Sequence, residues 1–188
     1  MLRRSIAVSI AGGSDARVDP ISWSNLARMV LDLGRFDEAT ALAERAMRQA
    51  RARGDTVVAD QAQLMAARAN SAAGHAARAE ALLDDVEARF RTMFPPTHAA
   101  FTAVATDRVR AALERGDLTR ATQLADDGVR FMESDPRLAT ALPLALRLRA
   151  AVHLRAGRYA QALADLERLL PMTRSSVPEG VLSSGLGN

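Results

Sequence analysis

Four glycines recur at a nearly constant spacing along this chain. Gly34, Gly74, Gly116 and Gly157 stand 40, 42 and 41 residues apart. Five residues after each stands an alanine (Ala39, Ala79, Ala121 and Ala162), and seven residues before each stands a small or β-branched apolar residue (Ala27, Ala67, Val109 and Ala150). A repeat of this length is typical of stacked helix pairs, because one pair cannot bury its apolar face without a neighbour. The period therefore predicts an all-α solenoid of about four helix pairs.

Helical periodicity between these markers predicts eight helices. Asp19-Pro20 and Asp135-Pro136 indicate helix starts, since aspartate caps a first turn and proline lacks an amide hydrogen that this turn does not need. Each glycine then ends a helix in the left-handed conformation that other residues disfavour. The expected helices cover residues 20–33, 36–53, 56–73, 76–93, 98–115, 118–133, 137–156 and 159–172.

The array is expected over residues 20–172. Its units would be about 20–54, 55–95, 96–134 and 135–172. Residues 1–19 would form part of a preceding repeat helix and a linker, because Leu2, Ile6 and Ile10 lie one turn apart; the alternative is a secretory signal beginning at Arg3-Arg4. Residues 173–188 are expected to form a disordered tail, since they are rich in serine and glycine and have no periodicity.

Composition argues against several classes of protein. The chain has no cysteine, hence no disulfide framework and no thiolate metal site, which fits a cytoplasmic protein. No apolar run approaches the roughly 20 residues of a membrane span. All 25 basic residues are arginines interleaved with 22 acidic ones, so a net charge of only +3 accompanies a pI of about 10.7. Nucleic-acid binding needs a concentrated basic face with aromatic side chains, so we expect neither a nucleic-acid nor a membrane partner.

The first unit resembles the tetratricopeptide repeat. Trp23, Leu26, Ala27 and Val30, followed by the run Leu33-Gly34-Arg35-Phe36-Asp37-Glu38-Ala39, follow that family's signature. Later units match less closely, since Gln63, Ala105 and Leu146 replace the tryptophan. The long period and the linker at residues 94–98 resemble kinesin light chains and many bacterial multidomain regulators. The resemblance implies a right-handed superhelical solenoid in which Trp23 and Leu26 pack the helix pair together and the first helices line a concave groove.

Patterns of catalytic or metal-binding residues are absent from the sequence. The three histidines, His75, His98 and His153, lie far apart and none has a metal-ligand spacing. No nucleophile elbow, phosphate-binding loop or paired-carboxylate motif occurs. We therefore expect no enzymatic activity, no metal and no cofactor.

A column of arginines marks the candidate binding site. Arg28, Arg68 and Arg110 each stand six residues before a turn glycine, on the face that the resemblance directs into the groove. The alternative is that they pair with acids such as Asp107 and only space the helices apart; Asp32 and Glu114 are the other candidate acids. The full set of expected groove residues is Arg28, Arg68, Asn70, Thr106, Arg110, Arg147, His153 and Arg155.

The predicted function is a protein-interaction scaffold whose groove binds a protein or peptide segment, with acidic segments favoured by the arginines. The alternative is a regulatory or sensor repeat domain of a larger bacterial signalling protein, such as a serine/threonine kinase or an ATP-dependent transcription regulator. An RNA-binding repeat is disfavoured, since no base-reading pair of side chains recurs in each unit. Exposed apolar ends are expected, and with them either self-association or missing flanking repeats. The residues concerned are Leu163, Leu166, Leu169, Leu170 and Met172 on the last helix and Leu2, Ile6 and Ile10 on the first half-helix.

Overall fold

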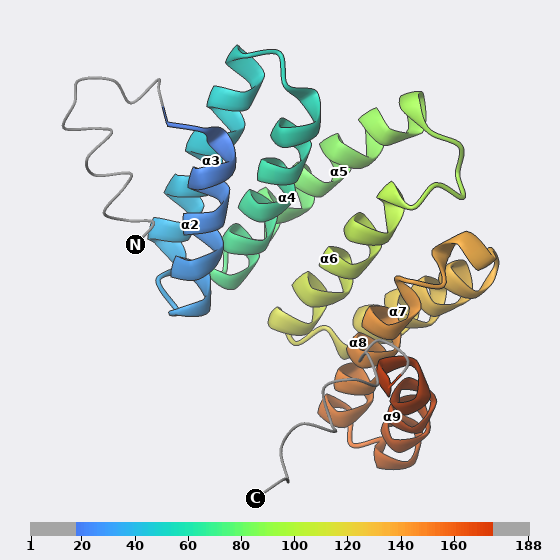
Figure 1. Cartoon of the computed structure of the whole chain (residues 1–188). Helices are drawn as coiled ribbons and strands as arrows, with labels where there is room; N and C mark the ends of the chain where they lie inside the picture. The colour runs from blue at the N-terminus through green and yellow to red at the C-terminus, as the bar shows by residue number, and fades with distance from the viewer. Residues whose placement is uncertain (1–17, 175–188) are drawn as a thin grey trace, which may run out of the picture.

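The computed structural model describes residues 18–174, which form eight α-helices and one short 3-10 helix (Figure 1). In chain order these are α2 (Pro20–Asp32), α3 (Phe36–Ala52), α4 (Thr56–Ala72), α5 (Ala76–Met93), α6 (Ala100–Glu114), α7 (Leu118–Glu133), η2 (Pro136–Leu138), α8 (Leu142–Arg155) and α9 (Tyr159–Arg174). Seven of the eight α-helices begin and end within two residues of the expected bounds. The expectations for residues 1–17 and 175–188 lie outside the described residues.

The helices stack as consecutive pairs, each leaning on the next (Figure 1). The pairs are α2/α3, α4/α5, α6/α7 and α8/α9, which confirms the predicted all-α solenoid. No helix between residues 18 and 174 combines the length and apolar character needed to cross a membrane. The alanines five residues after the turn glycines, Ala39, Ala79, Ala121 and Ala162, are all fully buried. Trp23 and Leu26 are also buried, as the tetratricopeptide pattern implied, and the Arg45 guanidinium lies 4.3 Å from the centroid of the Trp23 ring.

The turn glycines end the first helix of each pair as predicted. Gly34 and Gly116 have φ angles of 73° and 74°, in the left-handed region that a Cβ atom disfavours. The residue after each glycine donates its amide hydrogen back to the helix, as in the bond of 3.1 Å from Arg35 to the Val30 carbonyl. This bond satisfies a carbonyl at the helix end that would otherwise lack a partner.

The start of the fourth unit differs from the expectation of one helix over residues 137–156. The chain instead forms η2, turns through residues 139–141, and begins α8 only at Leu142. The reason is Pro143, whose ring would collide with the carbonyl of a preceding helical turn and which has no amide hydrogen to donate. Proline is tolerated in a first turn, so α8 begins immediately before it.

Gln63 occupies the position that corresponds to Trp23 and is fully buried. Its amide nitrogen donates to the Leu82 carbonyl and to Asp85, both at 2.8 Å. Its side-chain oxygen accepts from Arg51 at 2.5 Å and from Arg89 at 2.8 Å. Hydrogen bonds from Gln63 and Arg89 lower the pKa of the Asp85 carboxyl. The second unit therefore replaces an aromatic contact with a charged network whose central group is buried and satisfied.

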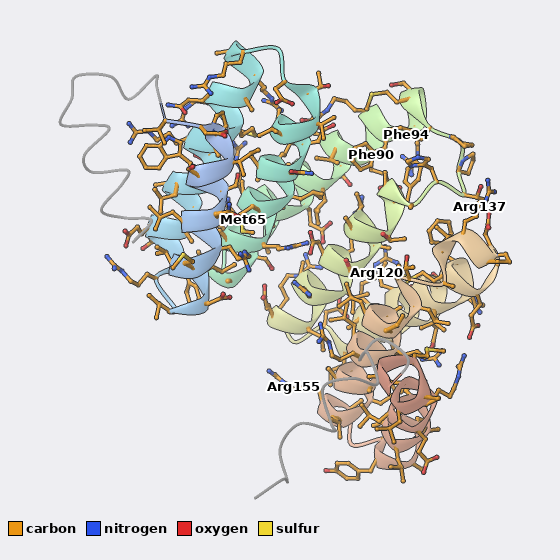
Figure 2. All side chains as sticks on the ribbon, in the orientation of Figure 1. Met65, Phe90, Phe94, Arg120, Arg137 and Arg155 are labelled. Carbon is orange, nitrogen blue, oxygen red and sulfur yellow. The ribbon has the colours of Figure 1, made fainter. Side chains whose placement is uncertain are left out.

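The long linker between α5 and α6 is held by a chain of rings. Phe90 makes edge-to-face contacts with Phe94 and Phe101 at centroid distances of 5.7 and 6.0 Å, and Phe94 stacks on His98 at 4.1 Å. Figure 2 shows Phe90 and Phe94 near the end of α5, beside this linker. Edge-to-face and offset-stacked arrangements are the favoured geometries of such pairs.

The apolar core is divided along α6. Helices α2 to α5 share one cluster that also includes Val104 from the first half of α6. Val109 and Ala112, from its second half, belong to a separate cluster with residues of α7 and α8. Two hollows adjoin α6: one of about 320 Å³ next to α2 and α4, and one of about 270 Å³ between α5, α6 and α7.

Ion pairs bridge this junction between the second and third units. Arg108 of α6 reaches three carboxylates of α5, at 3.1 Å from Glu80, 2.6 Å from Asp84 and 2.6 Å from Glu87. Arg115 adds a second contact to Glu80 at 3.2 Å. Attachment of the third unit to the second thus depends on charge as well as on apolar burial.

Candidate binding groove

A hollow lined by two predicted site residues, Arg68 and Arg110, lies between the first helices α2, α4 and α6. Its volume is about 320 Å³, at the lower end of the range for small-ligand or side-chain pockets. Its apolar lining consists of Leu31, Phe36, Ala67, Ala72, Leu83 and Ala111. Its polar lining consists of Arg68, Ser71, Asp107, Arg110 and Glu114. The hollow therefore combines an apolar surface with charged groups, as peptide-binding grooves do.

Arg68 and Asp107 form an ion pair across the hollow. The Arg68 Nε atom donates to Asp107 Oδ1 at 2.6 Å, and the Asp107 side chain is almost completely buried. Burial raises the pKa of the Asp107 carboxyl, against the opposing attraction of Arg68. The second carboxylate oxygen of Asp107 has no hydrogen-bond partner among the described residues. Arg68 therefore compensates a buried charge, which is the pairing alternative drawn from the sequence.

Arg110 differs from Arg68 because its guanidinium forms no hydrogen bond or ion pair with any residue from 18 to 174. Its side chain is half-buried beside the same hollow. Burial lowers the pKa of Arg110, and the nearby positive charges of Arg68 and Arg147 lower it further, although Asp107 opposes this shift. Partial burial of a cation that makes no hydrogen bond or ion pair is energetically unfavourable. Arg110 is therefore the one arginine of the column, within residues 18–174, that is half-buried and forms no ion pair.

Three further arginines of the predicted site lie at the surface. Arg28 on α2 and Arg147 and Arg155 on α8 are exposed, and none forms a side-chain hydrogen bond or ion pair within the described part of the chain. Figure 2 shows the Arg155 side chain extending away from the ribbon of α8. Together with Arg110 they leave positive charge available along the first helices.

The remaining predicted site residues are buried within the array. Asn70 donates to the Ala66 carbonyl at 2.8 Å, and Thr106 donates to the Ala103 carbonyl at 2.9 Å, so both side chains bond back to their own helices. His153 lies 3.8 Å from Asp165, and burial lowers its pKa. All three side chains are buried, and none of them lines the hollow between α2, α4 and α6.

Sequence reasoning did not select the residues that form the apolar lining. Phe36 entered only as part of the repeat signature, and no sequence pattern singled out Leu31 or Ala111. Ser71, which donates to Glu114, was also missed. A signal existed for Phe36, since the family pattern places a bulky residue there. No group of three or more histidine, aspartate or glutamate side chains suited to a metal ion occurs between residues 18 and 174.

Comparison with known proteins agrees with this architecture. Residues 23–51 match the family model of the tetratricopeptide repeat. No curated protein matches the chain in sequence. A kinesin light chain-like protein with nearly identical repeats, from Podosopora anserina, is similar with a TM-score of 0.59 and 20% identity, over 93% of this chain and 85% of that one. BtubC (BKLC) from P. vanneervenii is similar with a TM-score of 0.63 and 18% identity, over 100% of this chain and 77% of that one. Residues 23–51 thus form a tetratricopeptide repeat, and the array as a whole has the fold of kinesin light chain-like tetratricopeptide repeats.

Proposed function

We propose that this chain is a protein-interaction scaffold without catalytic activity of its own, and that the groove along α2, α4 and α6 binds an acidic segment of a partner protein. The observation that carries the proposal is Arg110, a half-buried guanidinium that forms no hydrogen bond or ion pair within residues 18–174 and lies beside a largely apolar hollow. A carboxylate bound there would remove the cost of the unpaired charge, and arginine grips carboxylates with two parallel hydrogen bonds. The same groove would serve a regulatory repeat domain whose bound segment lies in the same polypeptide.

The spacing of the column constrains the bound segment. Adjacent helices pack roughly 10 Å apart, and an extended peptide advances about 3.3 Å per residue. Acidic residues three positions apart would therefore meet neighbouring first helices. Exposed Arg28 at one end and Arg147 at the other provide charges for a segment longer than the central hollow.

The test uses fluorescein-labelled twelve-residue peptides with an apolar residue at the centre and aspartates three positions apart, titrated by fluorescence anisotropy. Arg110→Gln should weaken binding at least tenfold, and binding to the native chain should weaken as salt rises. The matched control is Arg130→Gln on α7, an equal change of charge at an exposed side chain outside the hollow. Arg68→Ala is unsuitable as the central variant, because it would leave Asp107 buried without its cation.

An equal loss of affinity in Arg110→Gln and Arg130→Gln would mean that the peptide responds only to net charge, and would contradict binding in the groove. Affinity that is indifferent to salt, or unchanged in Arg110→Gln, would also contradict it. Peptides in which serine replaces each aspartate should bind the native chain no better than they bind Arg110→Gln.

A further inference from the structure

The outward face of the last helix, α9, is apolar and exposed. Leu163, Leu166 and Leu170 lie on one stripe and are 56%, 38% and 54% exposed. Spacings of three, four and seven residues place them on the same side of the helix. Residue 166 stands nine positions after Gly157, which allows comparison with the same position in the three preceding second helices.

The three preceding units bury this position. Ala43, Leu83 and Ala125 stand nine residues after their own turn glycines and are at most 3% exposed. Ala43 belongs to a cluster with residues of α4, and Ala125 to a cluster with Val152 of α8. Leu83 lines the same hollow as Ala111 of α6, so residues of the following unit belong to the surroundings of this position in all three cases. In the fourth unit Leu166 is 38% exposed instead, and no following unit lies against α9 among residues 18–174.

A recurring ion pair also connects each second helix to the following unit. The acid ten residues after each turn glycine receives an arginine from the following unit: Glu44 from Arg78 at 3.5 Å, Asp84 from Arg108 at 2.6 Å, and Asp126 from Arg149 at 3.4 Å. Glu167 is the fourth member of this series. It is exposed, and its carboxylate has no hydrogen-bond or ion-pair partner in the described range.

We propose that the outward face of α9 docks the first helix of a tetratricopeptide-type repeat belonging to a partner protein, and that this repeat brings an arginine to Glu167. The leucine stripe requires an apolar helix face, and Glu167 requires a cation one helix away. Arg108 and Arg149 both stand eight residues before a turn glycine. The docking repeat is therefore expected to have its arginine at one of two positions. The arginine stands either eight residues before the glycine that ends the first helix, as Arg108 and Arg149 do, or four residues after that glycine, as Arg78 does.

A second copy of this chain fits the face less well. Its first unit would present Leu26 eight residues before the glycine and Glu38 four residues after it, where the internal junctions have arginines. Leu26 is already buried in its own unit. Glu38 would approach Glu167 with a charge of the same sign, which is unfavourable at such an interface.

The test is site-specific photo-crosslinking in the full chain, expressed in its own cells. A benzoylphenylalanine replaces Leu166 in one variant and Ala164 in the control. The control position is matched, because the residues seven positions after the other turn glycines, Ala41, Ala81 and Gln123, are exposed in every unit. The crosslinked peptide is sequenced by mass spectrometry.

The expected result is crosslinking from position 166 and not from 164, to a helical repeat with arginine at one of the two stated positions. Glu167→Arg should then weaken the complex about tenfold, and replacing the partner's arginine by glutamate should restore it. Crosslinks to a second copy of this chain, crosslinks to a segment without that arginine, equal crosslinking from both positions, or none from position 166 would each overturn the proposal.

Discussion

Gly128 lies in the interior of α7, where the fold does not require a glycine. Its φ angle is not in the left-handed region, and a Cβ atom built on it would meet no heavy atom within 4 Å. Alanine is favoured over glycine in a helix interior by about 1 kcal/mol, because glycine loses more conformational freedom on folding. We therefore expect Gly128→Ala to raise the free energy of unfolding by about 1 kcal/mol. For a chain of this size that corresponds to about 2–4 °C in melting temperature.

Gly116→Ala is the matched control, since the substitution is chemically identical and a Cβ atom there also meets nothing within 4 Å. The backbone conformation differs, with φ at 74°, and Gly116 is exposed whereas Gly128 is buried. The left-handed conformation costs a residue with a Cβ about 1–2 kcal/mol, so this variant should be destabilised. Urea unfolding followed by far-UV circular dichroism should separate the two variants by about 2–3 kcal/mol. Destabilisation by Gly128→Ala would refute the reasoning and indicate that α7 packs too closely for a methyl group.

Two further predictions concern charge. Arg108→Gln should lower the free energy of unfolding by about 1–3 kcal/mol, between the values typical of exposed and buried pairs, because Arg108 contacts three carboxylates across the α5/α6 junction. This loss should be smaller in 1 M salt, where the screening length is about 3 Å. A loss that is independent of salt in urea titrations would contradict the prediction. Burial, with the nearby Arg158 charge, lowers the pKa of His153, so the unfolded chain binds the proton first and stability should fall as the pH drops below about 6.5. His153→Asn should flatten the dependence of the urea midpoint on pH between 7 and 5, and an unchanged slope would exclude His153 as its source.

The helix bounds could be predicted because their determinants are local. A glycine with positive φ and a proline in a first turn act through sterics of a few neighbouring residues, so Gly34 and Pro20 mark boundaries wherever the chain folds. Pro143 is a local signal of the same kind. It marks the start of α8 at Leu142, whereas the prediction from periodicity placed this start at residue 137. The chain itself contained what was needed to place it correctly.

The groove could be predicted only in part, because it depends on the rotation of each helix about its axis. One residue along a helix turns the side chain by about 100°. Arg110 and Ala112 are only two residues apart, yet the first adjoins the hollow and the second is in the core. The choice between Arg68 as a ligand for a partner and Arg68 as the counterion of Asp107 depends on how α4 and α6 pack, and no local rule determines that packing.

The division of the core along α6 also has a mechanical consequence. In a linear stack of elements that touch only their neighbours, bending and unfolding concentrate at the most compliant joint. Between residues 18 and 174 one such joint lies beside α6, where two apolar clusters separate and two hollows remain. We expect the two halves to behave as stiff arms whose mutual angle fluctuates about α6. The hollow beside Arg110 is formed across this joint, so a change of the angle between the two halves would widen or narrow it. A segment bound there would therefore restrict the motion of the two halves.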